Sequence, residues 1–157
     1  MWLAFRSIYF EIGMMSHEEL EEGSELSLDW DKLSAIGRMN LKVIPAVAQD
    51  VETGTVLIVG YVNAEALMEA RRLGVAVFWS TSRNALWVKG ATSGNTLKLE
   101  AIRINCEQNS ILYRVHVSEG KGACHTANVD GSARFGCYYR KLNAEGLLEL
   151  IEDRDAL

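Results

Sequence analysis

The chain has 157 residues, of which 48% are hydrophobic and 24% are charged, the profile of one compact globular domain with a substantial core. Its formal net charge of -5 and its isoelectric point near 5.2 argue against a broad basic face, so we expect no nucleic-acid partner and no membrane partner. A small phosphate ester could still be held by a few Arg, Lys and backbone N–H groups.

The opening stretch is apolar but is interrupted by charged residues, which is typical of neither a signal peptide nor a membrane span. We therefore expect a cytoplasmic protein. Ser16 and Glu19 have the spacing of a helix capping box and directly follow Met14 and Met15. Two interpretations stay open: translation begins at one of these methionines, or the first residues are a natural extension. We assign residues 1–40 to an N-terminal extension with a short helix.

Regular patterning begins at about residue 41. Two β-branched runs, 42–50 and 55–62, flank a polar turn that contains a glycine, which predicts a hairpin. Residues 63–74 predict a short amphipathic helix, with Asn63 as N-cap and Gly74 as terminator. The hairpin is thus expected to lead directly into a helix.

Further strands are predicted by alternating apolar and polar residues, and they cover residues 75–80, 84–88, 96–105 and 111–117. Trp79 and Trp87 lie in these patterns and are expected in the core, although either could stack on a base. Residues 143–157 predict a closing helix. The expected class is α+β, a mostly antiparallel β-sheet domain with short flanking helices.

Three cysteines, Cys106, Cys124 and Cys137, are the first chemical signal. An odd number in a chain without an export signal argues against a disulfide framework. Three thiolates suggest zinc, because catalytic zinc commonly has three protein ligands and leaves the fourth position to water. The spacings match no compact zinc motif, so buried thiols that act as small hydrophobic side chains are the alternative.

Three phrases read together resemble a known family. Residues 77–95, residues 104–112 and the pair 122–126 and 137–140 are similar, in order and spacing, to phosphoribosyl-AMP cyclohydrolase of histidine biosynthesis. The resemblance covers about residues 41–142, which we assign to a cyclohydrolase-like catalytic domain. It implies a homodimeric hydrolase, dependent on zinc and magnesium, that opens the purine ring of phosphoribosyl-AMP at the N1–C6 bond.

The resemblance also implies roles for single residues. Cys106, Cys124 and Cys137 would hold zinc at a site shared between two subunits, which explains their uninformative spacing. Zinc would lower the pKa of the attacking water, and His125 would shuttle protons. An equally weighted interpretation is that His125 only hydrogen-bonds the backbone, or orients Cys124 without itself binding the metal. His116 lies in a strand pattern and is expected to be structural.

A polar loop follows the second tryptophan and suits a phosphorylated ligand. Lys89, Thr92 and Ser93 supply donors for phosphate or ribose oxygens, and Gly94 lets the backbone approach a ligand. Arg83 in the preceding turn could make a bidentate phosphate contact. By composition alone this loop is an ordinary polar turn, and the resemblance is what favours substrate binding.

Several positions depart from the family pattern. The family's Asp-Cys-Asp-x-Asp phrase, whose carboxylates hold magnesium, reads here Asn105, Cys106, Glu107, Gln108 and Asn109. One carboxylate and two amides should bind magnesium much more weakly, because charge offsets the loss of its water ligands. Ala91 stands in place of a glutamate and Thr81 in place of an arginine. The segment between the second and third cysteines is several residues longer than usual.

Three functions therefore stay open. The first is the inherited reaction with reduced dependence on magnesium, and the second is a divergent paralogue that hydrolyses another heterocyclic amidine. The third is a non-catalytic, zinc-stabilised dimer used for binding or metal storage. A purely structural zinc would need neither the adjacent histidine nor the phosphate-like loop, which argues against the third. The shared phrases favour the first.

Overall fold

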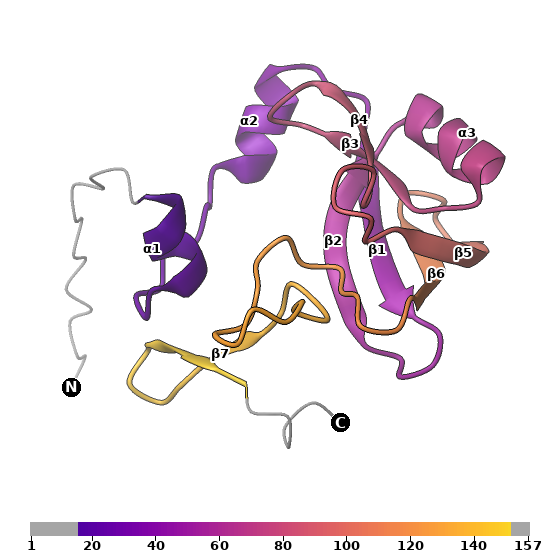
Figure 1. Cartoon of the computed structure of the whole chain (residues 1–157). Coiled ribbons are helices and arrows are strands. Elements are labelled where there is room, and N and C mark those ends of the chain that lie inside the picture. The colour runs from indigo at the N-terminus through magenta and orange to yellow at the C-terminus, as the bar shows by residue number, and fades with distance from the viewer. Residues whose placement is uncertain (1–15, 152–157) are drawn as a thin grey trace.

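The computed structural model describes residues 16–151 and confirms the α+β class (Figure 1). Its elements, in chain order, are α1 (His17–Glu22), α2 (Lys32–Arg38), β1 (Ile44–Asp50), β2 (Val56–Val62), α3 (Ala64–Leu73), β3 (Val77–Ser80), β4 (Ala85–Val88), β5 (Leu97–Ile104), β6 (Ile111–Val117), β7 (Arg140–Leu142) and β8 (Leu148–Leu150).

The central sheet has four strands in the order β2-β1-β6-β5. The pairs β1–β2 and β5–β6 are antiparallel, as predicted, whereas the middle pair β1–β6 is parallel. The sheet is therefore mixed. Strand β6 buries every second side chain, at Ile111, Tyr113 and Val115, because successive residues of a strand point to opposite faces.

The β3–β4 hairpin and α3 cover one face of this sheet and close the core (Figure 1). The hydroxyl of Tyr113 on β6 donates a hydrogen bond of 3.0 Å to the carbonyl oxygen of Val77 on β3. Phe78 packs between the rings of Tyr113 and Trp87, with centroid distances of 5.7 and 5.6 Å. Trp79 and Trp87 are partly buried and pack against the core, as expected.

Both ends of α3 follow the sequence prediction. The side chain of Asn63 accepts a hydrogen bond of 2.8 Å from the N–H of Ala66, and Gly74 ends the helix with a φ of 67°. Ala66 and Ala70 form its buried face. The predicted capping box also forms at α1, where Ser16 is the N-cap.

The predicted helix over residues 143–157 is wrong in its described part. Strands β7 and β8 form a hairpin there instead. Asn143 turns the chain, because its side chain accepts the N–H groups of Glu145 and Leu147, and Gly146 adopts a φ of 82°. Residues 152–157 and the two candidate start methionines lie outside the described residues.

Long apolar helices are absent from residues 16–151: none of the helices there could cross a membrane.

Removing the Tyr113 hydroxyl should destabilise the fold. In the Tyr113→Phe variant the buried carbonyl oxygen of Val77 loses this donor. We therefore expect the free energy of unfolding to fall by about 1 kcal/mol. Urea denaturation measures the loss. Tyr61→Phe is the matched control, because the Tyr61 hydroxyl has no hydrogen bond to residues 16–151; equal effects of the two changes would contradict the assignment.

Candidate active site

Two of the three cysteines lie in the segment after β6, residues 122–137, which we call the cysteine loop. It folds back on itself: the N–H of Ala123 donates a hydrogen bond of 2.8 Å to the carbonyl oxygen of Phe135. A Cβ at Gly122 would lie 2.0 Å from the carbonyl oxygen of Arg134, so this approach requires glycine. The fold-back brings the two ends of the loop together.

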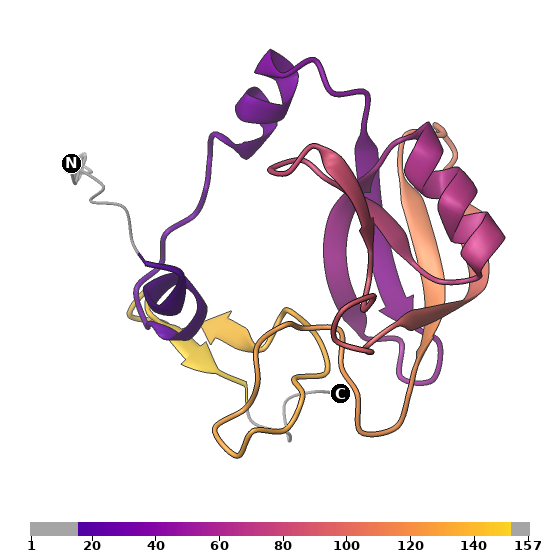
Figure 2. The same ribbon diagram turned by 45° about the horizontal axis from the view of Figure 1, so that its top comes forward.

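The end of the loop is fixed to the central sheet. The N–H of Cys137 donates a hydrogen bond of 2.7 Å to the carbonyl oxygen of Leu57 on β2. A Cβ at Gly136 would lie 3.4 Å from the Leu57 backbone, so the loop runs close against that strand. Cys137 itself packs against the core. Figure 2 shows the cysteine loop, in orange, beside the central sheet.

The sulfurs of Cys124 and Cys137 share a hydrogen bond. This bond, helped by the Thr126 hydroxyl 3.1 Å from the Cys124 sulfur, lowers the pKa of Cys124 to about 5. The bond to Cys124, together with burial, raises the pKa of Cys137. At neutral pH the pair therefore holds one proton, on Cys137, and Cys124 is a thiolate.

Lys89 is the predicted site residue that the structure brings to the cysteine pair. It ends the β3–β4 hairpin and is 4% exposed. Burial lowers the pKa of Lys89, while the nearby sulfurs of Cys137 and Cys124 act in the opposite direction. An ammonium group beside a thiolate is the arrangement that stabilises a reactive sulfur or a metal ligand.

The polar loop after Lys89 is built as the sequence indicated. Gly90 has a φ of 82°, and a Cβ there would lie 2.2 Å from the backbone of Asn95, so the loop closes tightly at its base. Thr92, Ser93 and Gly94 form its exposed tip. The hydroxyl groups of Thr92 and Ser93 can meet a ligand from solvent, whereas the N–H of Gly94 donates a hydrogen bond of 2.8 Å to the carbonyl oxygen of Gly90.

Arg83 lies apart from the cysteine pair, at the opposite end of β4 from Lys89. Its Nε donates a hydrogen bond of 3.2 Å to the Ser80 hydroxyl. A cavity of about 190 Å³ lies beside this hairpin, and Trp79 and Trp87 line part of it. The tryptophans are therefore core residues that also present ring surface to a small cavity.

Cys106 also lies apart from the pair. It is exposed in the turn between β5 and β6, whereas the cysteine loop follows the other end of β6. Seven residues of strand separate these ends by about 20 Å. Among residues 16–151, no three His, Cys, Asp or Glu side chains are grouped so that they could hold a metal ion. Within one chain, therefore, only Cys124 and Cys137 of the three predicted zinc ligands lie close together.

The predicted magnesium positions come together but are bonded to one another. The Asn105 Oδ1 accepts the N–H groups of Asn109 and Ser110 at 3.0 and 2.9 Å, and its Nδ2 donates to the Asn109 Oδ1 at 2.8 Å. The Asn109 Nδ2 donates to Glu107 at 3.0 Å. Amide N–H groups occupy the oxygens that a cation would need, so this turn does not fit magnesium.

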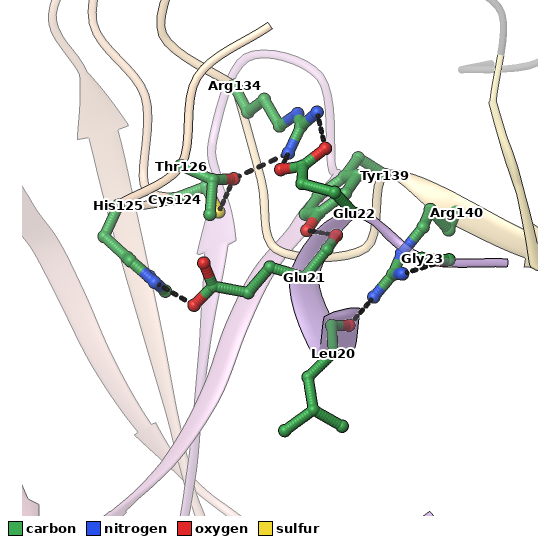
Figure 3. Close-up of polar contacts among 10 residues, drawn as sticks. All are labelled: Leu20, Glu21, Glu22, Gly23, Cys124, His125, Thr126, Arg134, Tyr139 and Arg140. Carbon is green, nitrogen blue, oxygen red and sulfur yellow. Dashed lines mark hydrogen bonds and ion pairs between the residues drawn. The ribbon is translucent and has the colours of Figure 1, made fainter. Parts of the chain in front are cut away.

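His125 is exposed and points toward α1 (Figure 3). Its Nε2 lies 2.6 Å from the Oε1 of Glu21. Sequence reasoning missed Glu21, because an acidic run on a short helix reads as a solvated face. By contrast His116 lies 3.1 Å from Glu100 and 3.4 Å from Glu52, consistent with a structural role on the sheet.

Arg134 is the second residue that the sequence did not reveal. It is 3% exposed, and its guanidinium donates to both carboxylate oxygens of Glu22, at 2.6 and 2.9 Å. It also donates to the Thr126 hydroxyl at 2.9 Å and lies 4.0 Å from the ring centroid of Tyr139. A buried arginine in a polar loop carries no periodic signal by which it could be found.

Comparison with known proteins gives a consistent result. The profile of the family "Phosphoribosyl-AMP cyclohydrolase" matches residues 58–139. The chain belongs to the phosphoribosyl-AMP cyclohydrolase family. Similar relatives of that name include proteins from Hyphomonas neptunium (44% identity; 72% of this chain and 79% of the relative) and Natronomonas pharaonis (39%; 74% and 90%). A third, from Salinibacter ruber, is 42% identical over 73% of this chain and 87% of its own.

The family resemblance predicted from the three phrases is thereby confirmed, and with it the prediction of an enzyme of the cyclohydrolase class. The matched segment contains Lys89, the three cysteines and His125. Helix α1 lies outside it. The contacts that α1 makes with the cysteine loop are therefore features of this cyclohydrolase that the family profile does not describe.

The shared proton of the cysteine pair can be tested directly. Cys137→Ala removes the donor that lowers the pKa of Cys124, so this pKa should rise from about 5 toward its ordinary value. In metal-free protein carrying Cys106→Ala, the ultraviolet absorbance of thiolate should be present at neutral pH and vanish as the pH falls through about 5. With Cys137→Ala added, it should appear only as the pH rises above about 7. If the two proteins, with and without Cys137→Ala, give the same titration curve, the hydrogen bond between the two sulfurs is refuted.

Proposed function

We propose that this chain hydrolyses phosphoribosyl-AMP, opening the purine ring at the N1–C6 bond in histidine biosynthesis, and that it does so in the cytoplasm. Family membership carries the proposal. The grouping of Cys124, Cys137 and Lys89, with His125 next to it, supports it, because a ring-opening hydrolase needs a charged, partly buried site with a proton-transfer group.

The reaction defines what the residues must do. The C6–O bond forms as water attacks, the N1–C6 bond breaks, and the departing N1 gains a proton. The water oxygen becomes a carbonyl oxygen, so both of its protons must leave: one reaches N1 and the other reaches the exocyclic nitrogen on C6. His125 suits this transfer, because its ring is exposed and its Nδ1 has no hydrogen-bond partner within residues 16–151.

Zinc is the metal that the cysteine pair fits. Two neighbouring sulfurs, one of them already a thiolate, are the soft donors that zinc prefers. We assign the third position to Cys106 of a second copy, since Cys106 is exposed at the far end of β6. Trp30 and Leu33, 85% and 68% exposed, offer apolar surface for that second copy to cover. When bound, zinc supplies a Lewis acid that makes water more acidic.

The remaining predicted site residues divide between two tasks. Lys89 is buried beside the two sulfurs, so its positive charge can offset the negative charge of the thiolates. The exposed hydroxyls of Thr92 and Ser93 suit the phosphate or ribose oxygens, and Gly94 beside them has no side chain that would keep a ligand away. Arg83 is exposed as well, and its guanidinium could hold a phosphate on the other side of the hairpin.

The second candidate function is a paralogue that acts on a different heterocyclic amidine. The self-bonded turn at Asn105, Glu107 and Asn109 favours it, because loss of a magnesium site would alter how a diphosphorylated substrate is held. A non-catalytic zinc-stabilised dimer is disfavoured, since it would need neither the buried lysine nor the exposed histidine.

The protein should open the ring of phosphoribosyl-AMP without added magnesium. The amide N–H groups already bound to the turn oxygens leave little for the cation to bind, so magnesium should raise kcat by less than about twofold. The change in the purine ultraviolet spectrum on ring opening measures turnover, with and without magnesium after treatment with a chelator selective for it. No turnover under either condition would favour the paralogue.

Zinc binding should depend on a cysteine from each of two chains. Cys106→Ser and Cys124→Ser should each lose most of the roughly one zinc per chain expected for a three-cysteine site. Co-expressed chains carrying one change each should recover one intact site per heterodimer, because Cys106 of one chain meets Cys124 and Cys137 of the other. Elemental analysis of the purified heterodimer measures this recovery.

A site formed within one chain would give no recovery, because each chain of that heterodimer would lack a ligand. Metal-free, normally folded wild-type protein would defeat the zinc proposal itself. Tyr61→Phe again serves as the control that should leave the zinc content unchanged.

A further inference from the structure

We propose that Glu21 is a positioning residue for His125: its carboxylate fixes which nitrogen of the imidazole carries the proton and where the ring points. The inference rests on the proposed function in one respect, namely that His125 transfers protons in the reaction. Glu21 itself touches no reacting atom. It acts from α1, a helix that the family profile does not include.

The contact determines the tautomer of the ring. The Oε1 of Glu21 lies 2.6 Å from the Nε2 of His125, a short hydrogen bond. A carboxylate can only accept, so Nε2 must carry the proton. In the neutral ring Nδ1 then holds the lone pair, and it is the nitrogen that can take a proton from water. Without Glu21 nothing within residues 16–151 would select between the two tautomers.

Glu21 can do this because its own helix is held firmly. A helix of six residues is not stable alone, so its place is set by its contacts. The hydroxyl of Tyr139 donates a hydrogen bond of 2.7 Å to the Glu21 carbonyl oxygen. The Arg140 guanidinium donates to the carbonyl oxygens of Leu20 and Gly23, at 2.7 and 2.8 Å. Three backbone carbonyls around Glu21 are thus fixed (Figure 3).

The next residue ties the helix to the cysteine loop. Glu22 makes a two-bond contact with the buried guanidinium of Arg134, which also donates to the Thr126 hydroxyl. That hydroxyl lies 3.1 Å from the Cys124 sulfur. Glu21 thus contacts His125 directly, and Glu22 is linked through Arg134 to Thr126, the next residue of the loop, which lies against the Cys124 sulfur (Figure 3). These contacts hold the imidazole in place relative to the sulfur.

The same contact could instead obstruct catalysis by covering the ring. The exposure of the two side chains argues against this: the imidazole stays 75% exposed, whereas the Glu21 side chain is 31% exposed. The carboxylate lies at one edge of the ring and leaves most of it open to solvent. Positioning and obstruction predict opposite changes in kcat.

The test compares Glu21→Ala with Glu21→Gln in the purified full-length protein. Alanine removes the acceptor, so kcat for ring opening should fall about tenfold while KM stays within about twofold. Glutamine keeps an oxygen that can accept from Nε2, so kcat should return to within about threefold of wild type. In a His125→Ala background, Glu21→Ala should cause no further loss. Glu18→Ala on the same helix is the matched control and should behave as wild type, since the Glu18 side chain is exposed and has no hydrogen bond or ion pair within residues 16–151.

A spectroscopic measurement separates this inference from the proposed function. Imidazole ¹⁵N chemical shifts should identify the proton on Nε2 of the neutral His125 ring in wild type and a mixture of tautomers in Glu21→Ala. Unchanged shifts, an unchanged or raised kcat in Glu21→Ala, or an equal loss in Glu18→Ala would overturn the positioning role. A wild type that never opens the ring would remove the proposed function, and the chemical shifts alone would then decide the role of Glu21.

Discussion

The hydrogen bond from the Cys137 N–H to the Leu57 carbonyl oxygen is the constraint on which the site depends. The cysteine loop has no helix or long strand of its own, and backbone hydrogen bonds at its two ends join it to itself and to β2. Gly122 permits the fold-back, because a Cβ there would lie 2.0 Å from the carbonyl oxygen of Arg134. A long and irregular segment is in this way held against a rigid sheet. Its side chains can therefore be positioned as precisely as those of the strands.

Local signals in the sequence were sufficient for most of the fold. The caps at Asn63 and Gly74, and the capping box at Ser16, depend on contacts within a few residues and could be predicted. The parallel pairing of β1 with β6 joins segments more than sixty positions apart, and no local pattern encodes it. The prediction of a closing helix was wrong for a related reason. An apolar run near Leu148 suits strand and helix equally, and the turn at Gly146 favours a hairpin.

The residues of the candidate site likewise include some that the sequence indicated and some that it did not. Cys124, Cys137 and Lys89 were identified from motif and resemblance, and the structure brings them together. Glu21 and Arg134 were not, because each has meaning only through a partner about a hundred positions away. Zinc binding by all three cysteines remains a prediction, because the proposed site would join Cys106 of one copy to Cys124 and Cys137 of another. An interface between chains has no signature in the spacing of residues within one chain.

The buried guanidinium of Arg134 has a consequence for which changes this chain can tolerate. Arg134 lies in the cysteine loop and Glu22 lies on α1, outside the segment that the family profile matches, yet each is the other's charge partner. Loss of Glu22 alone would leave the charge of Arg134 buried without its carboxylate, which is costly. A change that removes α1 therefore calls for a second change at Arg134.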